Sequence, residues 1–289
     1  MSSIWRPVRE RNPARSLMVV VAHPGDEAFG FAGAITEAVA AGAYVVVVCA
    51  TRGFFDPRLL DKAPAPGGRN RSYAKPVVWR NIDNVREDEM RRSVALLGVR
   101  VLRMLDYAED TLDKVDFDEL VSRIVEPIRM HRPEVLITFG ADGVTGDRDH
   151  QAISRAVDLA FDAAGRPLSY EDDLEEDQAA WRCAKLYHLV LPAEKVALLG
   201  DAAPDQLRTL DVSRPTLHLE LGELAGVKLA AINRHVSQTG SSGAFADWTP
   251  EVRDRFLASE DYRLVRSNLP VAAGASLSDG ERGLFDGLP

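Results

Sequence analysis

The sequence predicts an α/β protein: a single domain built on a Rossmann-like, mostly parallel sheet flanked by helices. Three observations carry this prediction. Short valine-rich runs, of the kind that are covered on both faces, alternate with segments of helical periodicity. Glycines follow several of the helical segments, as they do at helix C-termini. The chain has 289 residues, enough to bury the large core that such a fold needs.

The first two expected strands enclose a helix. Ser16 to Ala22 (SLMVVVA) is a short apolar run rich in valine, which is typical of a buried parallel strand. A helix is expected over Ala28 to Ala41, because Gly42 marks its end. Tyr44 to Ala50 (YVVVVCA) repeats the valine pattern and is expected to form the second buried strand.

The same alternation continues to the middle of the chain. Apolar residues recur near helical spacing within Asn84 to Leu97, and Gly98 ends this amphipathic helix. Val99 to Leu105 is expected to be the third strand. A helix over Phe117 to Met130 and a fourth strand over Val135 to Phe139 complete this part.

One more helix and strand follow, over His150 to Ala164 and Leu186 to Leu191.

Three segments interrupt the alternation of strands and helices. Gly53 to Asp83 is a long, proline-rich loop, expected to be shaped and to border the metal cleft or a subunit contact. Glu171 to Asp177 (EDDLEED) is expected to be a solvated loop. Val271 to Pro289 is expected to be a flexible C-terminal tail, which leaves 1–270 as the domain.

Composition and charge exclude several classes of protein. The formal net charge is −9, and an acidic surface repels phosphate backbones, so no nucleic-acid partner is expected. No segment is long and apolar enough to span a bilayer, and Met1 to Ser16 lacks the apolar region of a secretory signal. Cys49 and Cys183 make no disulfide framework. We expect a cytoplasmic protein without a membrane partner.

The first chemical motif is AHPGDE, Ala22 to Glu27, placed where the first strand ends and a helix begins. Ligands bind at the carboxyl ends of the strands in an open parallel sheet. His23 and Asp26 offer a nitrogen and an oxygen ligand three residues apart on a tight turn. Gly30 and Gly33 predict close packing of the following helix on the sheet.

The second motif is GDRDH, Gly146 to His150, which follows the strand Val135 to Phe139 and falls on the same edge. Two histidines and one carboxylate, with a fourth position left to water, are the ligand set of a catalytic zinc ion, which acidifies water and polarises a carbonyl. Taken singly, each motif favours an ordinary explanation: Asp26 could cap a helix from Ala28, and an Asp-x-His sequence is common by chance. Together they favour a metal site.

These motifs make the sequence similar to the LmbE/PIG-L family of zinc-dependent N-acetylglucosaminyl-type deacetylases and amidases. That family opens with a strand followed by AHPDDE-x3-GG and later carries an HPDH-like motif, where this chain has AHPGDEAFGFAG and GDRDH. The similarity runs from about Ser16 to Leu264. It includes Thr51-x-Gly53, Arg86-x-x-Glu89, Lys185-Leu-Tyr187 and Lys228 to Gln238 (KLAAINRHVSQ).

The resemblance implies that His23, Asp26 and His150 hold one zinc ion per chain, with another divalent ion as the alternative. It implies hydrolysis of an N-acyl group, foremost N-acetyl, from an amino sugar or a related small molecule. The expected partner is therefore a small-molecule substrate. Whether the chain forms a homo-oligomer stays open.

The same resemblance makes Arg86 a candidate substrate contact. Arg52 is a second candidate, because its guanidinium could bind a polar group of the substrate, although an arginine in a loop is more often only solvated. His235 and Gln238 lie in the family's C-terminal motif. His235 is a candidate substrate contact, and a structural hydrogen bond is the alternative for it.

Two departures from the family's pattern affect the chemistry and spare the ligands. Gly25 stands where the family has the aspartate taken as the general base, and glycine cannot accept a proton. Asp147 stands where the family has the histidine taken to stabilise the tetrahedral intermediate. Asp147 or Glu27 would then have to act as the catalytic base, and losing a base typically costs about 10²–10⁴-fold in rate.

Three functions therefore compete. The leading one is a metal-dependent N-deacetylase or amidase with an altered base at Gly25. The second is a catalytically impaired pseudo-enzyme that holds a metal or a ligand. The third, a nucleotide-binding oxidoreductase, is disfavoured because AHPGDE follows the first strand in place of a G-x-G-x-x-G turn.

Overall fold

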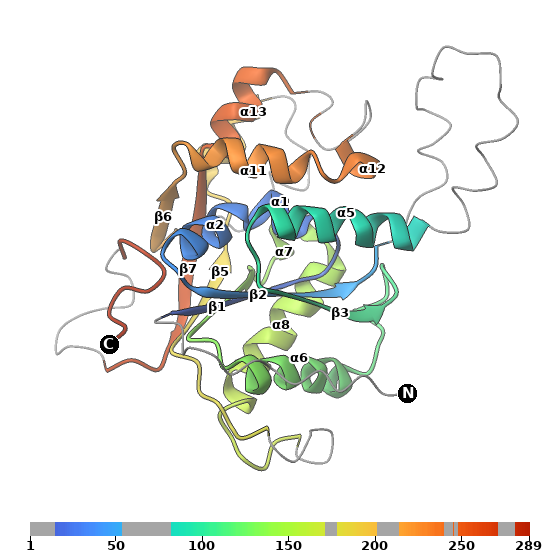
Figure 1. Cartoon of the computed structure of the whole chain (residues 1–289), viewed down its shortest axis with the longest axis vertical. Coiled ribbons are helices and arrows are strands. Elements are labelled where there is room, and N and C mark those ends of the chain that lie inside the picture. The colour runs from blue at the N-terminus through green and yellow to red at the C-terminus, as the bar shows by residue number, and fades with distance from the viewer. Residues whose placement is uncertain are drawn as a thin grey trace, which may run out of the picture.

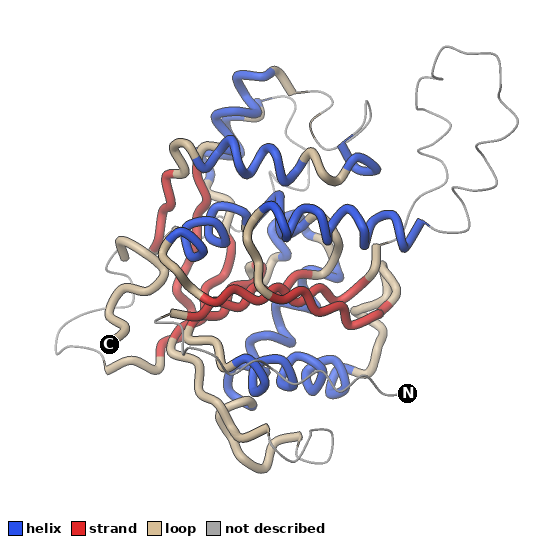
Figure 2. Tube along the Cα trace, viewed as in Figure 1, coloured by secondary structure: helices blue, strands red, loops and turns tan. Residues whose placement is uncertain are grey.

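The computed structural model describes residues 15–53, 82–170, 178–200, 214–239, 245, 248–270 and 281–289. Within these residues, one 7-stranded sheet runs in the order β3-β2-β1-β4-β5-β7-β6 (Figures 1 and 2). Strands β1 to β5 pair in parallel, and β7 pairs antiparallel with both β5 and β6. The predicted mostly parallel α/β fold is confirmed.

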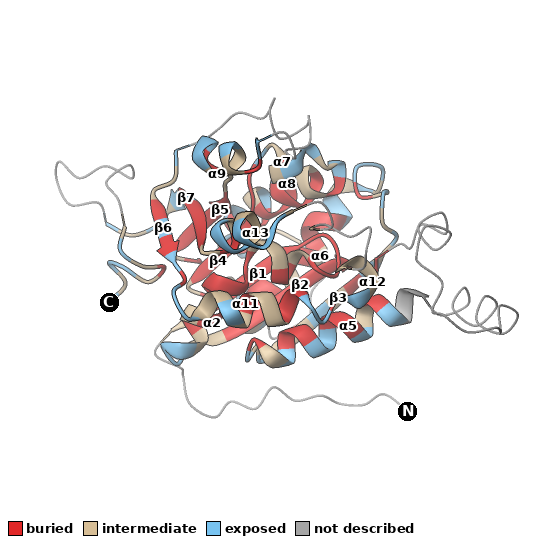
Figure 3. Cartoon of the chain, turned by 90° about the horizontal axis from the view of Figure 1, so that it is seen from above, coloured by how far each residue is buried: buried red, intermediate tan, exposed pale blue. Residues whose placement is uncertain are grey.

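Strands β1, β2, β4 and β5 are buried almost from end to end, whereas the edge strand β3 is mostly half-buried. Their continuous apolar runs follow from helices that cover both faces of the sheet, so that neither face requires polar side chains. Figure 3 shows this burial concentrated along the strands. The strands are β1 (Ser16–Val21), β2 (Tyr44–Thr51), β3 (Val101–Tyr107), β4 (Val135–Phe139), β5 (Lys185–Leu189), β6 (Leu217–Glu220) and β7 (Ser259–Ser267).

Helices form a layer on each side of the sheet. In Figure 1, α2, α5 and α11 lie above the sheet, α6 and α8 lie below it, and α13 packs on the outside of α11. The helices are α1 (Asp26–Gly30), α2 (Ala32–Ala40), α5 (Ile82–Leu96), α6 (Phe117–His131), α7 (Gly143–Gly146), α8 (Arg148–Ala163), α9 (Ala193–Leu198), α11 (Leu224–Ile232), α12 (Val236–Thr239) and α13 (Pro250–Leu257).

The strand order contains a topological switch point. From β1 the chain moves outward through β2 to β3, whereas β4 pairs on the opposite side of β1 and is followed by β5. The loops that leave the carboxyl ends of β1 and β4 therefore diverge and open a crevice between them. Both sequence motifs lie on these two loops.

The helix predicted over Ala28 to Ala41 is two helices, α1 and α2, which meet at Phe31 (φ −132°). The Glu260 carboxylate accepts hydrogen bonds from the backbone amides of Gly33 (2.8 Å) and Ala34 (2.9 Å). A carboxylate at this point satisfies the amides of a new helix N-terminus, so the chain starts a second helix there.

Glu260 belongs to a buried polar group that we call the closed cluster, made of Glu260, Lys228 and Tyr262. Lys228 Nζ lies 2.7 Å from Glu260 Oε1, and the Tyr262 hydroxyl donates to Oε2 at 2.6 Å. Each carboxylate oxygen thus accepts one backbone and one side-chain hydrogen bond, and all three residues are almost fully buried. The predicted close packing at Gly33 is also explained, because a β-carbon there would lie 2.8 Å from Glu260 Cδ.

The expectation of a flexible tail over Val271 to Pro289 does not hold for its last part. Leu284 is 1% exposed, and Glu281 pairs with the buried Lys185 and with the Tyr187 hydroxyl. These contacts fasten 281–289 to the start of β5. Residues 271–280 lie outside the described residues.

Two other sequence predictions fall on residues that the structure does not describe. The loop predicted from Gly53 to Asp83 lies outside them except for its two ends, and the acidic segment Glu171 to Asp177 lies wholly outside. Cys49 and Cys183 are both buried and unpaired. Of the helices in the described part of the chain, none has the length and apolar character needed to cross a membrane.

Candidate metal centre

The switch point brings the two motifs together. His23 lies two residues beyond the end of β1, and His150 lies in the first turn of α8, after β4. One ligand atom from each of His23, Asp26 and His150 falls within 4.8 Å of the others. His23 Nδ1 is 3.3 Å from His150 Nε2, which is in turn 3.4 Å from Asp26 Oδ1. Two atoms bound to one tetrahedral zinc ion at about 2.0–2.1 Å are separated by roughly 3.3 Å.

The outer partners of the two histidines fix which ring nitrogens face each other. Nδ1 of His150 lies 3.0 Å from the Gly143 carbonyl oxygen, which can only accept, so Nδ1 carries the proton. Nε2 of His23 lies 3.1 Å from the Asp149 carboxylate and carries the proton for the same reason. In neutral rings, the lone pairs of His23 Nδ1 and His150 Nε2 then point at each other beside Asp26. A cation held between them would satisfy both lone pairs and the Asp26 carboxylate, so these residues fit a metal ion.

The charges of the three residues favour the binding of a cation. Burial opposes ionisation of Asp26, but the nearby His150 and His23 lower the pKa of Asp26 to about 2. Burial also opposes protonation of His150, yet Asp26 and Asp147 raise the pKa of His150 to about 9. Against the same effect of burial, Asp149 and Asp26 raise the pKa of His23. The site therefore attracts positive charge.

Asp149 links His23 to the loop that follows β3. Its Oδ2 accepts from the Asp110 amide at 2.7 Å and faces His23, and its Oδ1 accepts from the Leu112 amide at 2.9 Å. In the structure Asp149 orients His23, and Gly143 orients His150.

The backbone of the first motif explains why Asp26 does not cap a helix. Gly25 is the N-cap of α1, and it makes no side-chain capping hydrogen bond. Asp26 Oδ2 instead accepts from the His23 amide at 2.7 Å, which closes the turn and points the carboxylate at the cluster. Gly25 has φ +114°, a conformation that L side chains rarely adopt.

Asp147 is the N-cap of α8. Its Oδ1 accepts from the amides of Asp149 (2.8 Å) and His150 (3.0 Å). This contact fixes the first turn of α8 and therefore the position of His150. Phe139, the last residue of β4, stacks on the His150 ring with the ring centroids 3.9 Å apart.

Glu27 and His235 form a buried pair behind the cluster, with both side chains fully inaccessible to solvent. Glu27 Oε1 lies 2.7 Å from His235 Nε2, and Oε2 accepts from the Gly25 amide at 2.9 Å. A substrate cannot reach His235, so its assignment as a substrate contact is corrected to the structural alternative. Glu27, one of the two predicted candidate bases, is enclosed in the same way.

The two candidate arginines are both engaged by carboxylates. Arg86 donates to Glu109 Oε2 at 2.7 Å and to the Pro24 carbonyl at 3.1 Å. Arg52 donates to Asp106 at 2.7 Å and to Glu87 at 2.8 Å. Arg86 thus reaches the loop that carries the ligands.

Sequence reasoning missed Glu109, whose Oε1 lies 3.9 Å from His23 Nε2. Burial raises the pKa of Glu109, and Arg86 and His23 oppose that shift. No local motif marks this residue. Its position just after β3, at the carboxyl edge of the sheet, is the signal that could have identified it.

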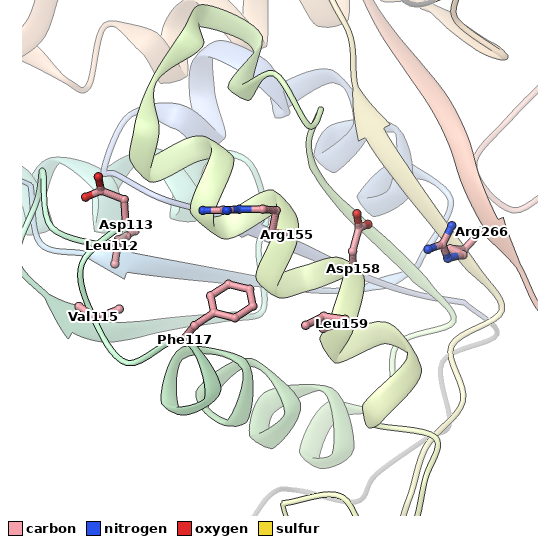
Figure 4. Close-up of a pocket in the computed structure, with 8 residues that line it drawn as sticks. All are labelled: Leu112, Asp113, Val115, Phe117, Arg155, Asp158, Leu159 and Arg266. Atoms are coloured by element: carbon pink, nitrogen blue, oxygen red, sulfur yellow. The ribbon is translucent and has the colours of Figure 1, made fainter.

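A cavity of about 560 Å³ opens elsewhere, between α6, α8 and the loop after β3 (Figure 4). Its lining is mixed, with apolar residues interspersed among two arginines and two aspartates. None of the predicted site residues is among them. The lining residues are Leu112, Asp113, Val115, Phe117, Arg155, Asp158, Leu159 and Arg266.

Curated relatives align along nearly the whole chain. A 1D-myo-inositol 2-acetamido-2-deoxy-alpha-D-glucopyranoside deacetylase from Geodermatophilus obscurus is 28% identical, over 96% of this chain and 99% of the relative. The enzyme with the same name from Streptomyces griseus is also 28% identical, over 96% of this chain and 90% of the relative.

Solved structures share the fold at lower identity. An N,N'-diacetylchitobiose deacetylase from Pyrococcus horikoshii superposes with a TM-score of 0.63 at 17% identity, over 87% of this chain and 84% of the other. A 4-carboxy-2-hydroxymuconate hydratase from Pseudomonas putida gives 0.61 at 15% identity, over 89% and 99%. The fold is therefore shared by proteins named for different reactions.

The family match spans residues 18–161, from β1 to the end of α8, and is described as PIG-L, GlcNAc-PI de-N-acetylase. This range contains both chemical motifs and all three ligands of the candidate metal centre. Together with the relatives that align along the whole chain, it shows that this chain belongs to the PIG-L/LmbE family.

Proposed function

We propose that the protein is a metal-dependent hydrolase that removes an N-acyl group, foremost N-acetyl, from an amino sugar or a related small molecule. The observation that carries the proposal is the pair of histidine nitrogens that face each other beside Asp26 at the switch point, with their tautomers fixed from outside. The names of the aligned relatives support the same chemistry, since they are deacetylases of an acetamido sugar linked to inositol.

In this proposal His23, Asp26 and His150 hold one zinc ion, or another divalent ion in its place. When bound, such an ion supplies a Lewis acid that polarises the amide carbonyl and acidifies water. Asp149, Gly143 and Phe139 hold the two imidazole rings in position. Arg86, fixed to the ligand loop through the Pro24 carbonyl, is the proposed substrate contact, and Arg52 is the second candidate.

Proton transfer is the step for which the chain departs from its family. Glu27 has both oxygens engaged and no exposed surface. Asp147 uses Oδ1 as a helix cap, and its Oδ2 takes part in none of the hydrogen bonds among the described residues. We therefore propose Asp147 over Glu27 as the base that takes the proton of the attacking water.

A specific observation favours the second candidate function, the catalytically impaired pseudo-enzyme. Position 25 carries no side chain, and its φ of +114° disfavours one. An assay of acetate release from N-acetylglucosaminyl-inositol and N-acetylglucosamine, with zinc added, separates the two functions. Turnover that chelation abolishes and zinc restores supports the hydrolase. Stoichiometric zinc binding without acetate release supports the pseudo-enzyme. A cytoplasmic location and the oligomeric state stay predictions.

A further inference from the structure

The short helix α12 lies against the loop that supplies two of the three metal ligands. Its residue Gln238 donates through Nε2 to the Pro24 carbonyl at 2.8 Å. Pro24 stands between His23 and the Gly25–Asp26 turn, so this contact fastens the middle of the ligand loop to a segment more than 200 residues further along the chain.

Gln238 also occupies the space beside Gly25. A β-carbon at position 25 would lie 2.9 Å from Gln238 Oε1, 3.1 Å from Nε2 and 3.3 Å from Cδ. The shortest of these separations is closer than real β-carbons approach a neighbour. The carboxamide therefore packs directly on the glycine backbone, and the absence of a side chain at position 25 is what allows it to reach Pro24.

The rest of this segment is firmly anchored, so Gln238 has a fixed base. Glu89 of α5 accepts from the Ser237 amide at 2.8 Å and from the Ser237 hydroxyl at 2.6 Å. His235, just before α12, contacts Glu27 of α1 at 2.7 Å. From α5, Arg86 donates to the same Pro24 carbonyl at 3.1 Å.

We propose that Gln238 is a positioning residue for the metal centre: it holds the His23–Asp26 turn in its ligating conformation through Pro24 and through its packing on Gly25. The proposal rests on the proposed function, since it assigns to Gln238 a part in metal binding. It implies that Gly25 and Gln238 act as one unit, and that restoring an aspartate at position 25 alone displaces Gln238 and strains the turn.

The first test replaces Gln238 with leucine, which keeps the volume and removes the donor. We expect the dissociation constant for zinc to rise about 10–100-fold, the range typical of outer-shell partners. The visible spectrum of the cobalt-substituted protein should change, because the ligand geometry changes. Val236→Ala is the matched control. It shortens an exposed side chain of the same helix, and we expect an unaltered cobalt spectrum and zinc affinity.

Equal zinc affinity and identical cobalt spectra for Gln238→Leu and the wild type would overturn the proposal. So would equal changes in both variants, because α12 would then act only as a structural support. A wild-type protein that binds neither zinc nor cobalt would instead overturn the proposed function.

The second test needs no metal. It therefore tests the contact between Gly25 and Gln238 even if the wild-type protein binds neither zinc nor cobalt. In the metal-free protein, Gly25→Ala should lower the melting temperature by roughly 3 °C or more. In a Gln238→Ala background the same change should lower it clearly less, because the steric conflict is gone and only the backbone strain remains. Equal shifts in the two backgrounds would show that the two residues are not coupled, and the proposal would fail on its geometry.

Discussion

Two buried groups of charged side chains, one at the N-terminus of α1 and one at the N-terminus of α2, are built on different principles. In the closed cluster, each oxygen of Glu260 accepts two hydrogen bonds, including one from Lys228 and one from Tyr262. In the metal cluster, His23 and His150 turn their acceptor nitrogens toward each other beside an ionised Asp26.

The difference separates a structural ion pair from a binding site. The closed cluster satisfies its own charges, so nothing further can bind there without breaking it. In the metal cluster the outer ring nitrogens have fixed protein partners, whereas the inner ring nitrogens and the Asp26 carboxylate face one common point. A buried charge therefore indicates function in this fold only where its partners leave lone pairs directed at a common point.

The largest expected effect breaks the metal cluster. His150→Ala removes one of three ligands, and we expect stoichiometric zinc to be lost, together with any hydrolytic turnover. Elemental analysis after dialysis checks the metal content. His218→Ala is the control, because His218 is a half-exposed histidine of β6 whose bonds go to Asp261 and Glu220. Full zinc content in His150→Ala would remove the assigned ligand set.

The next effect breaks the closed cluster. Glu260→Gln leaves Lys228 as a buried charge without its carboxylate, which typically costs about 3–5 kcal/mol. Urea denaturation should show this loss, while the zinc affinity of the folded protein stays near that of the wild type. Glu251→Gln, on exposed α13, supplies the control. A loss of less than about 0.5 kcal/mol would mean that the cluster is not a closed ion pair.

A third prediction concerns a histidine that the fold keeps neutral. Burial, with a smaller effect of Arg103, lowers the pKa of His131 to about 4. This is below the value of about 6.5 for an unfolded chain, so the neutral ring stabilises the fold above pH 6.5 and that stability is lost as the pH falls toward 4. Over this window the wild type should lose on the order of 2 kcal/mol more than His131→Phe. If the free energy of unfolding falls with pH by the same amount in the two proteins, this prediction is wrong.

The smallest expected effect concerns Asp147. Asparagine caps helices as well as aspartate does, so Asp147→Asn should keep the stability and the zinc content. Turnover should fall by roughly tenfold or more if the carboxylate takes the proton. Asp147→Ala should additionally cost about 1 kcal/mol of stability through the lost cap of α8. Unchanged turnover in Asp147→Asn would favour the impaired alternative.

The parallel core could be predicted from the sequence, because its strands are buried on both faces and appear as continuous valine-rich runs. Strands β6 and β7 were missed. The segment SEDYRLVRS of β7 looks polar, and only the structure shows that Glu260 and Asp261 are buried against Lys228 and Lys195. Such pairing joins residues distant in the chain, and no local pattern reveals it.

The candidate site divides in the same way. Motifs with short spacing identified the three ligands, which the structure brings together. The roles of their partners depended on tertiary contacts. Asp149 lies next to His150 in the chain but orients His23, because the first turn of α8 points its carboxylate toward β1. Position 25 shows the same dependence on tertiary contacts, because an aspartate there would be opposed by the φ of +114° and by the neighbouring Gln238 side chain.

The hydrogen bonds of Asp149 allow opening of the metal centre to be followed by amide hydrogen exchange. Its two oxygens hold the amide hydrogens of Asp110 and Leu112 while Oδ2 also faces His23. Each of these amide hydrogens can exchange with solvent only after its hydrogen bond to the Asp149 carboxylate breaks. Their hydrogen–deuterium exchange rates therefore measure, residue by residue, how often the metal centre opens, and loading with zinc should slow both without any substrate or assay of turnover.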